Sequence, residues 1–345
     1  MSEKKPTMRD IADRLGISVV TVSKAIADKD GVGDELKKRI LETADVIGFK
    51  KNISAVSMRE GMTKDVGILV SERLLTTSIY MLLYQQLSKD LLNKGFFPIL
   101  ETIDRNKENQ LGHPILVAQG KVSALIILGQ MLPPYVAMLS QSGIPFLFLG
   151  CSAEGYDADS IVSDSYYGSY SLTCRLLALN HHDIAFVGNP RYSSITMDRK
   201  LGYQKALEEQ GIQVQADHII EDLSDLGEEK ELILPDPMPS AFVCDSCPTA
   251  SRLMQLLKKN GIQIPESASI VSFNDDYAAT HNHPMLTTYN EDIPLMAQSA
   301  TQSVETLFSK NPARHGRKTI AGTLALRESV APFGTPSWAQ LATFG

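Results

Sequence analysis

Along the first 50 residues, apolar side chains recur three or four positions apart, and turn-forming residues interrupt them. Thr7 and Asp10 have the spacing of a capping box, which predicts a helix that begins at Met8. Gly16 can adopt the positive φ of a tight turn, and a second helix is expected over residues 19–27. Two short helices joined by so tight a turn predict a helix-turn-helix.

A third amphipathic helix is predicted after Asp34, with Leu36 and Ile40 on its apolar stripe and Gly48 as its end. Residues 51–61 are polar and mildly basic, and they end on a glycine. This composition predicts a linker between the helical head and the remainder of the chain.

From Val66 onward, short apolar runs alternate with amphipathic stretches, as in parallel sheets covered by helices on both faces. A second such series starts near residue 183, so two doubly wound α/β lobes are predicted. Ligands of such sheets bind at the carboxyl ends of the strands, and the expected site is therefore a cleft between the lobes. The predicted strands span residues 66–70, 97–101, 124–128, 146–149, 183–187, 241–244 and 270–273. The predicted helices span residues 79–94, 108–119, 134–142, 167–179, 197–210 and 249–260.

The composition is that of an ordinary globular protein. The chain has 345 residues, of which 43% are apolar and 21% charged, and this length is enough for two or three folding units. The densest apolar runs, such as residues 144–149, are too short to cross a bilayer, and the start of the chain lacks the apolar stretch of a signal peptide. The four cysteines are too few for an extracellular disulfide framework. We therefore expect a cytoplasmic protein without a membrane partner.

Charge is distributed unevenly along the chain. Residues 1–64 hold 13 Lys and Arg against 10 Asp and Glu, whereas residues 65–345 hold 20 against 30. The small basic excess indicates a polyanion contact confined to the first segment, although chance alone could produce it.

The second predicted helix carries more outward residues than a small core can bury. Hydroxyl groups and a lysine suit DNA phosphates, and methyl groups suit thymine in the major groove. The residues concerned are Val19, Val20, Thr21, Ser23 and Lys24. A generic helical docking module is the alternative interpretation.

The head closely resembles that of the lac repressor/GalR family of bacterial transcription regulators. The resemblance implies that Val19, Val20 and Lys24 read an operator, with Lys24 as the donor to a base edge. The matching stretches are residues 7–12, 16–18, 21–24 and 32–49.

The same resemblance implies that residues 51–61 form a hinge that orders on operator binding, pairs with the second copy of a homodimer and inserts an apolar side chain into the minor groove. Met58 stands where the family usually has leucine, Lys51 replaces the usual proline, and Val56 replaces a common arginine. A flexible tether without a DNA role is the alternative. The residues expected to contact double-stranded operator DNA are Thr7, Val19, Val20, Thr21, Ser23, Lys24, Asn52, Ala55 and Met58.

Residues 66 to about 330 resemble the effector-binding core of the same family, which is similar to periplasmic sugar-binding proteins. The resemblance implies an all-α helix-turn-helix head and a two-lobed, periplasmic-binding-protein-like α/β core with parallel doubly wound sheets. The chain is expected to cross between the lobes near residues 161–163, 289–292 and 320–323. The implied domains are a head of residues 1–50, a hinge of 51–61, an N-terminal lobe of 62–162 plus 291–321, and a C-terminal lobe of 163–290 plus 322–345.

Effector contacts follow from the resemblance residue by residue. Arg199 occupies the position of the family's effector-contacting arginine, whose donors suit hydroxyl groups or a carboxylate. The alternative is that Arg199 forms an ion pair on the surface. The family's acid after the 270–273 strand is Asn274 here, with Asp275 beside it. Tyr80 matches an aromatic residue that can line the cleft or pack in the core. The expected effector-binding residues are Ser71, Tyr80, Arg199, Asp245, Ser246, Asn274 and Asp275.

Cys244 and Cys247 have the spacing of a redox pair or of half a zinc site. Cys244 ends a predicted strand, however, and no second pair of ligands follows, so both are expected to be buried thiols. The sequence has no nucleophile elbow, phosphate loop or zinc-protease signature. We therefore predict no enzyme activity, no cofactor and no metal.

These features together predict a homodimeric, ligand-responsive transcription repressor. A small neutral carbohydrate is the preferred effector, because Arg199, Asn274 and Asp275 offer donors and acceptors while Tyr80 is the one aromatic wall expected. The alternatives are a regulator that senses a purine or nucleoside, a cytoplasmic solute-binding protein with an idle head, and an α/β enzyme that uses the cleft.

Overall fold

The computed structural model describes residues 7–26, 31–46, 64–75, 78–152, 155–225, 227–275, 283–309 and 315–334. The head consists of α1 (Met8–Leu15), α2 (Val19–Ile26) and α3 (Asp34–Val46). Thr7 and Asp10 form both halves of the predicted capping box, and Gly16 ends α1 with φ 66°. Ile11, Val22 and Ile40 are fully buried where the three helices meet. The predicted helix-turn-helix is therefore present, whereas the predicted end of the third helix at Gly48 lies outside the described residues.

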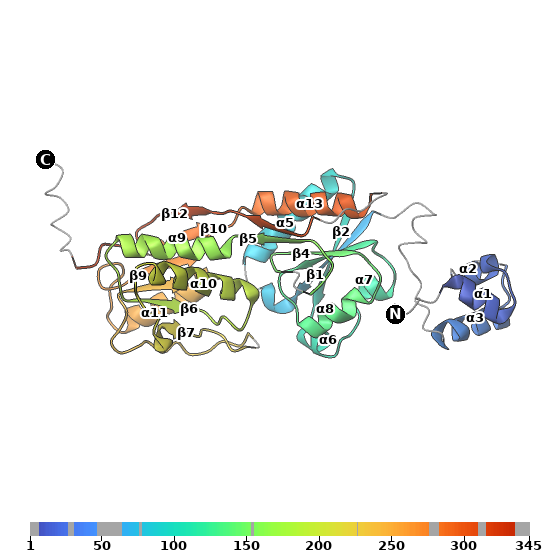
Figure 1. Ribbon diagram of the computed structural model, residues 1–345, viewed down its shortest axis with the longest axis horizontal. Coiled ribbons are helices and arrows are strands. Elements are labelled where there is room, and N and C mark those ends of the chain that lie inside the picture. The colour runs from blue at the N-terminus through green and yellow to red at the C-terminus, as the bar shows by residue number, and fades with distance from the viewer. Residues whose placement is uncertain are drawn as a thin grey trace.

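Two sheets organise the core, and each defines a lobe (Figure 1). The strands of lobe 1 are β1 (Asp65–Ser71), β2 (Phe97–Ile103), β3 (Ala124–Leu128), β4 (Phe146–Leu149), β5 (Ser160–Ser163) and β11 (Arg317–Ile320). The strands of lobe 2 are β6 (Ile184–Val187), β7 (Ile219–Ile220), β8 (Ala241–Cys244), β9 (Ser269–Phe273), β10 (Thr287–Asn290) and β12 (Thr323–Ala325). The strand order is β11-β5-β4-β3-β1-β2 in lobe 1 and β12-β10-β9-β8-β6-β7 in lobe 2. Among the described strands, all pairs are parallel except β10 with β12.

Helices cover both faces of each sheet. The apolar side chains of β3 are all buried, and they divide between one cluster beneath α5 and α13 and another beneath α7 and α8. The helices of lobe 1 are α5 (Ser78–Asn93), α6 (Arg105–Asn109), α7 (Ile115–Ala118), α8 (Pro133–Ser140) and α13 (Ile293–Leu307), and those of lobe 2 are α9 (Ser165–Ala178), α10 (Ser194–Glu208) and α11 (Cys247–Lys259). Short 3₁₀ turns lie at Glu72–Leu74 and Ala216–His218. This is the doubly wound α/β architecture that the sequence predicts.

The chain passes between the two sheets at three places. It leaves lobe 1 after β5, returns between β10 and α13, and leaves again between β11 and β12. Each lobe is therefore completed by segments distant in sequence, and the domain bounds given above stay a prediction.

One predicted helix is wrong. Residues 108–119 were expected to form a single helix, but α6 ends at Asn109 and α7 starts at Ile115. Pro114 directly precedes α7, where its fixed φ suits a helix start, and Leu111 has a φ of 55° that no α-helix contains. None of the described helices is both long and apolar enough to span a membrane.

Candidate functional site

A cavity of about 640 Å³ lies between the lobes. Residues that follow β1, β3, β4 and β5 line it from lobe 1, and residues that follow β6, β7, β8 and β9 line it from lobe 2. All of these are carboxyl ends of parallel strands, which is where such sheets present their ligand sites. The volume lies within the usual range of small-molecule sites.

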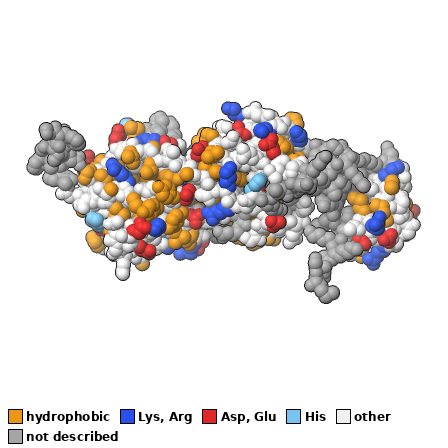
Figure 2. Space-filling model, turned by 45° about the horizontal axis from the view of Figure 1, so that its top comes forward, with side chains coloured by type: hydrophobic (Ala, Val, Ile, Leu, Met, Phe, Trp, Pro, Cys, Tyr) orange, Lys and Arg blue, Asp and Glu red, His pale blue; other side chains and the backbone are white. Residues whose placement is uncertain are grey.

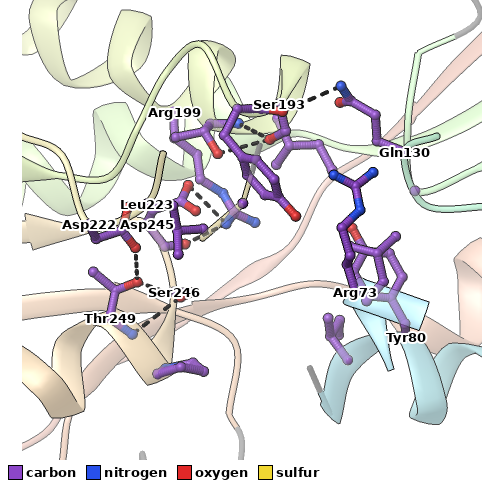
Figure 3. Close-up of a pocket in the computed structure, with 18 of the residues that line it drawn as sticks. Arg73, Tyr80, Gln130, Ser193, Arg199, Asp222, Leu223, Asp245, Ser246 and Thr249 are labelled. Atoms are coloured by element: carbon purple, nitrogen blue, oxygen red, sulfur yellow. Dashed lines mark hydrogen bonds and ion pairs between the residues drawn. The ribbon is translucent and has the colours of Figure 1, made fainter. Parts of the chain in front are cut away.

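Arg199 is the centre of the lobe 2 wall (Figure 3). It lies on the inner face of α10, and its guanidinium stacks over the Phe273 ring at 3.9 Å from the centroid. Its Nη1 donates to the backbone carbonyl of Asp245, and its Nη2 donates to Glu291 Oε1 at 3.1 Å. Its buried Nε has no partner among the described residues. Burial raises the pKa of Asp245, which the positive charge of Arg199 opposes.

A second buried carboxylate, that of Asp222, organises the same wall. Its Oδ1 accepts from the backbone N–H of Asn189 at 3.1 Å, and its Oδ2 accepts from Thr249 Oγ1 at 2.6 Å. Ser246 caps α11 by accepting from the Thr249 backbone N–H, so the loops after β7 and β8 are tied together (Figure 3). Lobe 2 thus presents charged and hydroxyl groups whose positions are fixed by hydrogen bonds.

The lobe 1 wall is largely apolar. Among the described residues of 64–163, Arg73 is the one charged residue that lines the cavity. Behind it, buried Glu108 accepts from Ser71 Oγ at 3.0 Å, from the Leu132 backbone N–H at 2.6 Å and from Arg73 Nη2 at 3.5 Å. The apolar lining residues are Leu74, Ile79, Tyr80, Leu83, Met131, Leu132 and Pro133.

Gln130, directly after β3, joins the two walls (Figure 3). Its Oε1 accepts from the Ser194 backbone N–H at 3.1 Å, and its Nε2 donates to the Tyr192 carbonyl at 3.5 Å. Gly129 precedes it with φ 71°, and a Cβ there would lie 2.4 Å from Leu74. The turn that aims Gln130 at lobe 2 therefore requires glycine.

The structure brings five of the predicted effector residues together at the cavity: Tyr80, Arg199, Asp245, Ser246 and Asn274. Ser71 and Asp275 do not line it. The Ser71 hydroxyl points to Glu108 at 3.0 Å, and Asp275 pairs with Arg327 and accepts from the Thr288 hydroxyl. Burial acts to raise the pKa of Asp275, but the hydrogen bonds from Arg327 and Thr288 and the positive charge of Arg327 together lower it.

Asn274 rather than Asp275 faces the cavity because the chain turns sharply after β9. Asn274 has a φ of 65°, a left-handed conformation that asparagine tolerates better than most residues. Its Oδ1 accepts from the Glu291 backbone N–H at 3.2 Å, next to one of the crossings between the lobes.

Sequence reasoning missed Gln130, Tyr192, Asp222 and Glu291, which also line the cavity. The expectation of a single aromatic wall is wrong, since Tyr192 lines the cavity as well as Tyr80. Their positions in the sequence could have indicated them, because each of these residues follows a strand at its carboxyl end.

The two close cysteines are buried, as expected. Burial raises the pKa of the Cys244 thiol, and the Cys247 thiol donates to the Asn274 carbonyl at 2.7 Å. Both behave as small core residues in this environment. Within the residues that the structure describes, no cluster of His, Cys, Asp and Glu could hold a metal ion.

In the head, α2 presents the expected outward residues. Val19 and Val20 are 40% and 65% exposed, and Lys24 is exposed as well. Thr21 and Ser23 are half-buried, and the Thr21 backbone N–H donates to Ser18 Oγ at 3.0 Å. The Thr7 hydroxyl donates to Asp10 at 2.7 Å within the cap of α1. The hinge residues Asn52, Ala55 and Met58 lie outside the described residues.

Two family models match the chain. One describes bacterial regulatory proteins of the lacI family and matches residues 7–52, and the other describes a periplasmic binding protein-like domain and matches residues 173–330. The HTH-type transcriptional regulator RegA of Clostridium saccharobutylicum is 25% identical over 94% of this chain and 98% of its own. The HTH-type transcriptional repressor PurR of Histophilus somni (strain 129Pt) is 21% identical over the same shares.

Solved structures show the same fold. A complex of the transcriptional regulator CelR with cellobiose has a TM-score of 0.68 at 21% identity, covering 94% of this chain and 100% of that one. The lac repressor dimer bound to operator and the anti-inducer ONPF has a TM-score of 0.66 at 19% identity, covering 95% and 100%.

These matches confirm the resemblance of head and core. The relatives are transcription regulators and not enzymes, and a regulator of this kind acts on bacterial DNA in the cytoplasm. The chain therefore combines a lacI-family DNA-binding head with a periplasmic binding protein-like core domain, and it is similar over nearly its whole length to transcription regulators.

Proposed function

We propose that the protein is a homodimeric repressor whose operator binding is controlled by a neutral carbohydrate in the interlobe cavity. The lobe 2 wall carries this proposal. It combines hydroxyl, amide and carboxylate acceptors with the buried and unbonded Nε of Arg199, a pattern that suits vicinal hydroxyl groups. The cavity lining holds four arginines against five carboxylates, a near balance that favours an uncharged ligand.

The opposite wall supports the same ligand class. The apolar lobe 1 side chains, with Tyr80 among them, suit the C–H face of a sugar ring. Among structures of similar fold, one contains cellobiose and another contains ribose. Tyr192 favours the alternative, a purine or nucleoside, because with Tyr80 it could stack on a flat base.

A thermal-shift panel of mono- and disaccharides, purine bases and nucleosides on the full chain tests the ligand class. A ligand at 100 times its Kd adds about 2.7 kcal/mol to the free energy of unfolding. We expect a sugar to raise the melting temperature and to change the affinity for the operator. A purine that does so while every sugar fails would contradict the carbohydrate assignment.

For operator recognition, we propose contacts from Thr7, Thr21 and Ser23 to phosphates and from Val19, Val20 and Lys24 to bases. The exposure of the latter three supports this role. Lys24→Ala is expected to lower specific affinity by about 1–3 kcal/mol and to leave nonspecific binding nearly intact. An equal loss on all DNA sequences would reassign Lys24 to a phosphate.

The hinge proposal concerns Asn52, Ala55 and Met58, with Met58 as the wedge between base pairs. Met58→Gly is expected to weaken operator binding and to reduce the DNA bend measured by gel phasing. An unchanged bend would remove Met58 from that role.

A further inference from the structure

The interlobe cavity is long, because its lining runs across most of both sheets. In lobe 2 it extends from Glu291, directly after β10, to Asp222 and Asp225, which follow β7. The strand order β10-β9-β8-β6-β7 separates these two ends by four strand spacings, about 19 Å. In lobe 1 the lining extends from Ser163, the last residue of β5, to Arg73 after β1, which is three spacings or about 14 Å. A single sugar ring is shorter than either distance and leaves one end of the cavity without ligand.

The crossing end of the cavity, next to the passages of the chain between the lobes, holds two polar atoms without partners. Ser163 Oγ and Arg199 Nε are buried, and neither has a hydrogen-bond partner among the described residues. Both residues line the cavity, and they are only 9% and 6% exposed. Buried polar groups almost always have a partner, so this pair suits a ligand group that both donates and accepts, as a hydroxyl does. Asn274 and Glu291 line the same end.

Two aromatic rings lie at different places along the cavity. Tyr80 lies beside the ends of β3 and β4, because a Cβ on Gly129 or Gly150 would lie 2.7 Å or 3.5 Å from its ring. Tyr192 lies against the segment after β7, because a Cβ on Gly227 would lie 2.7 Å from its ring. Each aromatic ring can therefore pack against the C–H face of a separate sugar ring.

The β7 end of the cavity offers polar groups of a different kind. Arg191 Nε donates to both carboxylate oxygens of Asp225 at 3.1 Å, and Arg191 Nη2 donates to Glu221 at 2.7 Å. The side chains of Arg191 and Asp225 line the cavity and are 59% and 56% exposed. A sugar ring at this end replaces water on groups that are already paired. We therefore expect the β7 end to add affinity and the crossing end to discriminate between sugars.

We propose that the cavity binds a disaccharide, with one ring at the crossing end against Ser163, Arg199 and Tyr80 and the second ring at the β7 end against Tyr192. The inference rests on the proposed function, a neutral carbohydrate effector, and it narrows that class by the length of the ligand. Tyr192 then packs against the second sugar ring instead of one face of a purine.

Calorimetry on the full chain tests the length of the ligand. The probes are D-glucose, D-galactose and D-fructose, together with cellobiose, maltose, trehalose, lactose, melibiose and sucrose. We expect a disaccharide to bind more tightly than either of its component monosaccharides by a factor of about ten or more. A monosaccharide that binds as tightly as every disaccharide containing it would overturn the inference and leave the carbohydrate proposal standing. If no sugar binds and a purine or nucleoside does, the carbohydrate proposal fails and the inference fails with it.

Two variants assign the sugar rings to the two ends of the cavity. Tyr192→Leu should remove most of the advantage of the disaccharide and leave the affinity for its component monosaccharide nearly unchanged, because a single ring occupies the crossing end. Ser163→Ala should weaken both sugars by a similar factor of about two to ten, because both use the crossing end. It should not lower the melting temperature of the unliganded protein, since the Ser163 hydroxyl has no partner to lose.

The control for Tyr192→Leu removes a tyrosine ring elsewhere on the same lobe. Figure 2 shows hydrophobic side chains gathered on an outer face of lobe 2. Tyr166 of α9 is 39% exposed and is not part of the cavity lining, so Tyr166→Leu should leave the affinity for both sugars unchanged. The inference would be overturned if the disaccharide kept its advantage in Tyr192→Leu, or if Ser163→Ala bound both sugars with native affinity.

Discussion

The two walls of the interlobe cavity differ in kind. Lobe 2 contributes Arg199, Asp222 and Asp245, each held by hydrogen bonds, whereas lobe 1 contributes mostly aliphatic and aromatic side chains. Directional groups discriminate between ligands, because a buried donor or acceptor left without a partner costs about 1–3 kcal/mol. Apolar groups contribute affinity according to the area they bury, with little discrimination. We therefore expect lobe 2 to select the effector and lobe 1 to close over it.

The charged wall has a structural requirement that the apolar wall lacks. Arg199, Asp245 and Glu291 are tolerated inside the protein only as partners, since breaking a buried pair leaves an uncompensated charge. Recognition and stability are thus coupled in lobe 2. On the lobe 1 wall of the cavity, the corresponding buried charge is that of Glu108, which faces Arg73.

Removal of the Arg199 guanidinium should have the largest effect. Arg199→Ala leaves two carboxylates unpaired, so we expect the free energy of unfolding to fall by about 3–5 kcal/mol and the ligand response to vanish. Chemical denaturation and calorimetry measure the two effects. Arg191→Ala is the control for stability: Arg191 also pairs with two carboxylates but is 59% exposed, so solvent screens its ion pairs and its loss should lower stability far less. Equal losses in the two variants would show that burial does not set the strength of the Arg199 pair.

The buried Glu108 carboxylate holds the lobe 1 wall in place, and its replacement tests whether ligand binding depends on that role. Glu108→Gln cannot accept from Ser71, Arg73 and the Leu132 backbone as the carboxylate does, so stability should fall by about 1–3 kcal/mol and ligand affinity should fall with it.

Glu101→Gln is the matched control for that variant. Glu101 also lies in lobe 1, and it accepts from the Ile115 and Leu116 backbone N–H groups and from Lys107, away from the cavity. Its loss should lower stability alone. If both variants lose ligand affinity equally, Glu108 acts only through the stability of lobe 1.

The sequence predicts the sheets better than the loops between them. Residues 124–128 and 146–149 form continuous apolar runs, and β3 and β4 have the same bounds, because strands buried on both faces need no alternation. The predicted 108–119 helix failed where Gly112 and Pro114 outweighed the apolar periodicity.

The candidate effector residues came from the family resemblance, which supplied Arg199, and the structure places Arg199 on the buried face of α10. The resemblance could not decide every position. Asn274 and Asp275 are neighbours beyond a strand, and only the left-handed turn at Asn274 decides which of them faces the cavity. Tyr192 and Asp222 lie on loops whose direction depends on contacts distant in sequence, such as that between Asp222 and Thr249.

Removal of the Gln130 side chain, which bridges the two walls of the cavity, should have a moderate effect. Gln130→Ala removes the acceptor for Ser194 N–H and the donor to the Tyr192 carbonyl. The arrangement of the two lobes in this structure should therefore become less stable by about 0.5–1.5 kcal/mol. Ligand affinity should fall by the corresponding factor, and small-angle scattering should show a larger radius of gyration without ligand. Gln141→Ala, on the surface after α8, is the control. A loss of affinity with no change in scattering would mean that Gln130 touches the ligand instead of holding the lobes together.

Tyr80→Phe should have the smallest effect. Burial raises the pKa of the Tyr80 hydroxyl, so the group stays neutral, and the ring packs where Gly129 leaves room for it. If lobe 1 serves as an apolar cover, removal of one hydroxyl leaves the buried area and the ring contact intact, and calorimetry should give nearly the native Kd. Tyr80→Ala, which removes the ring, should weaken binding clearly. A Tyr80→Phe loss as large as that of Gln130→Ala would place a specific polar contact on lobe 1, and the division between a selecting lobe and a covering lobe would then fail at this residue.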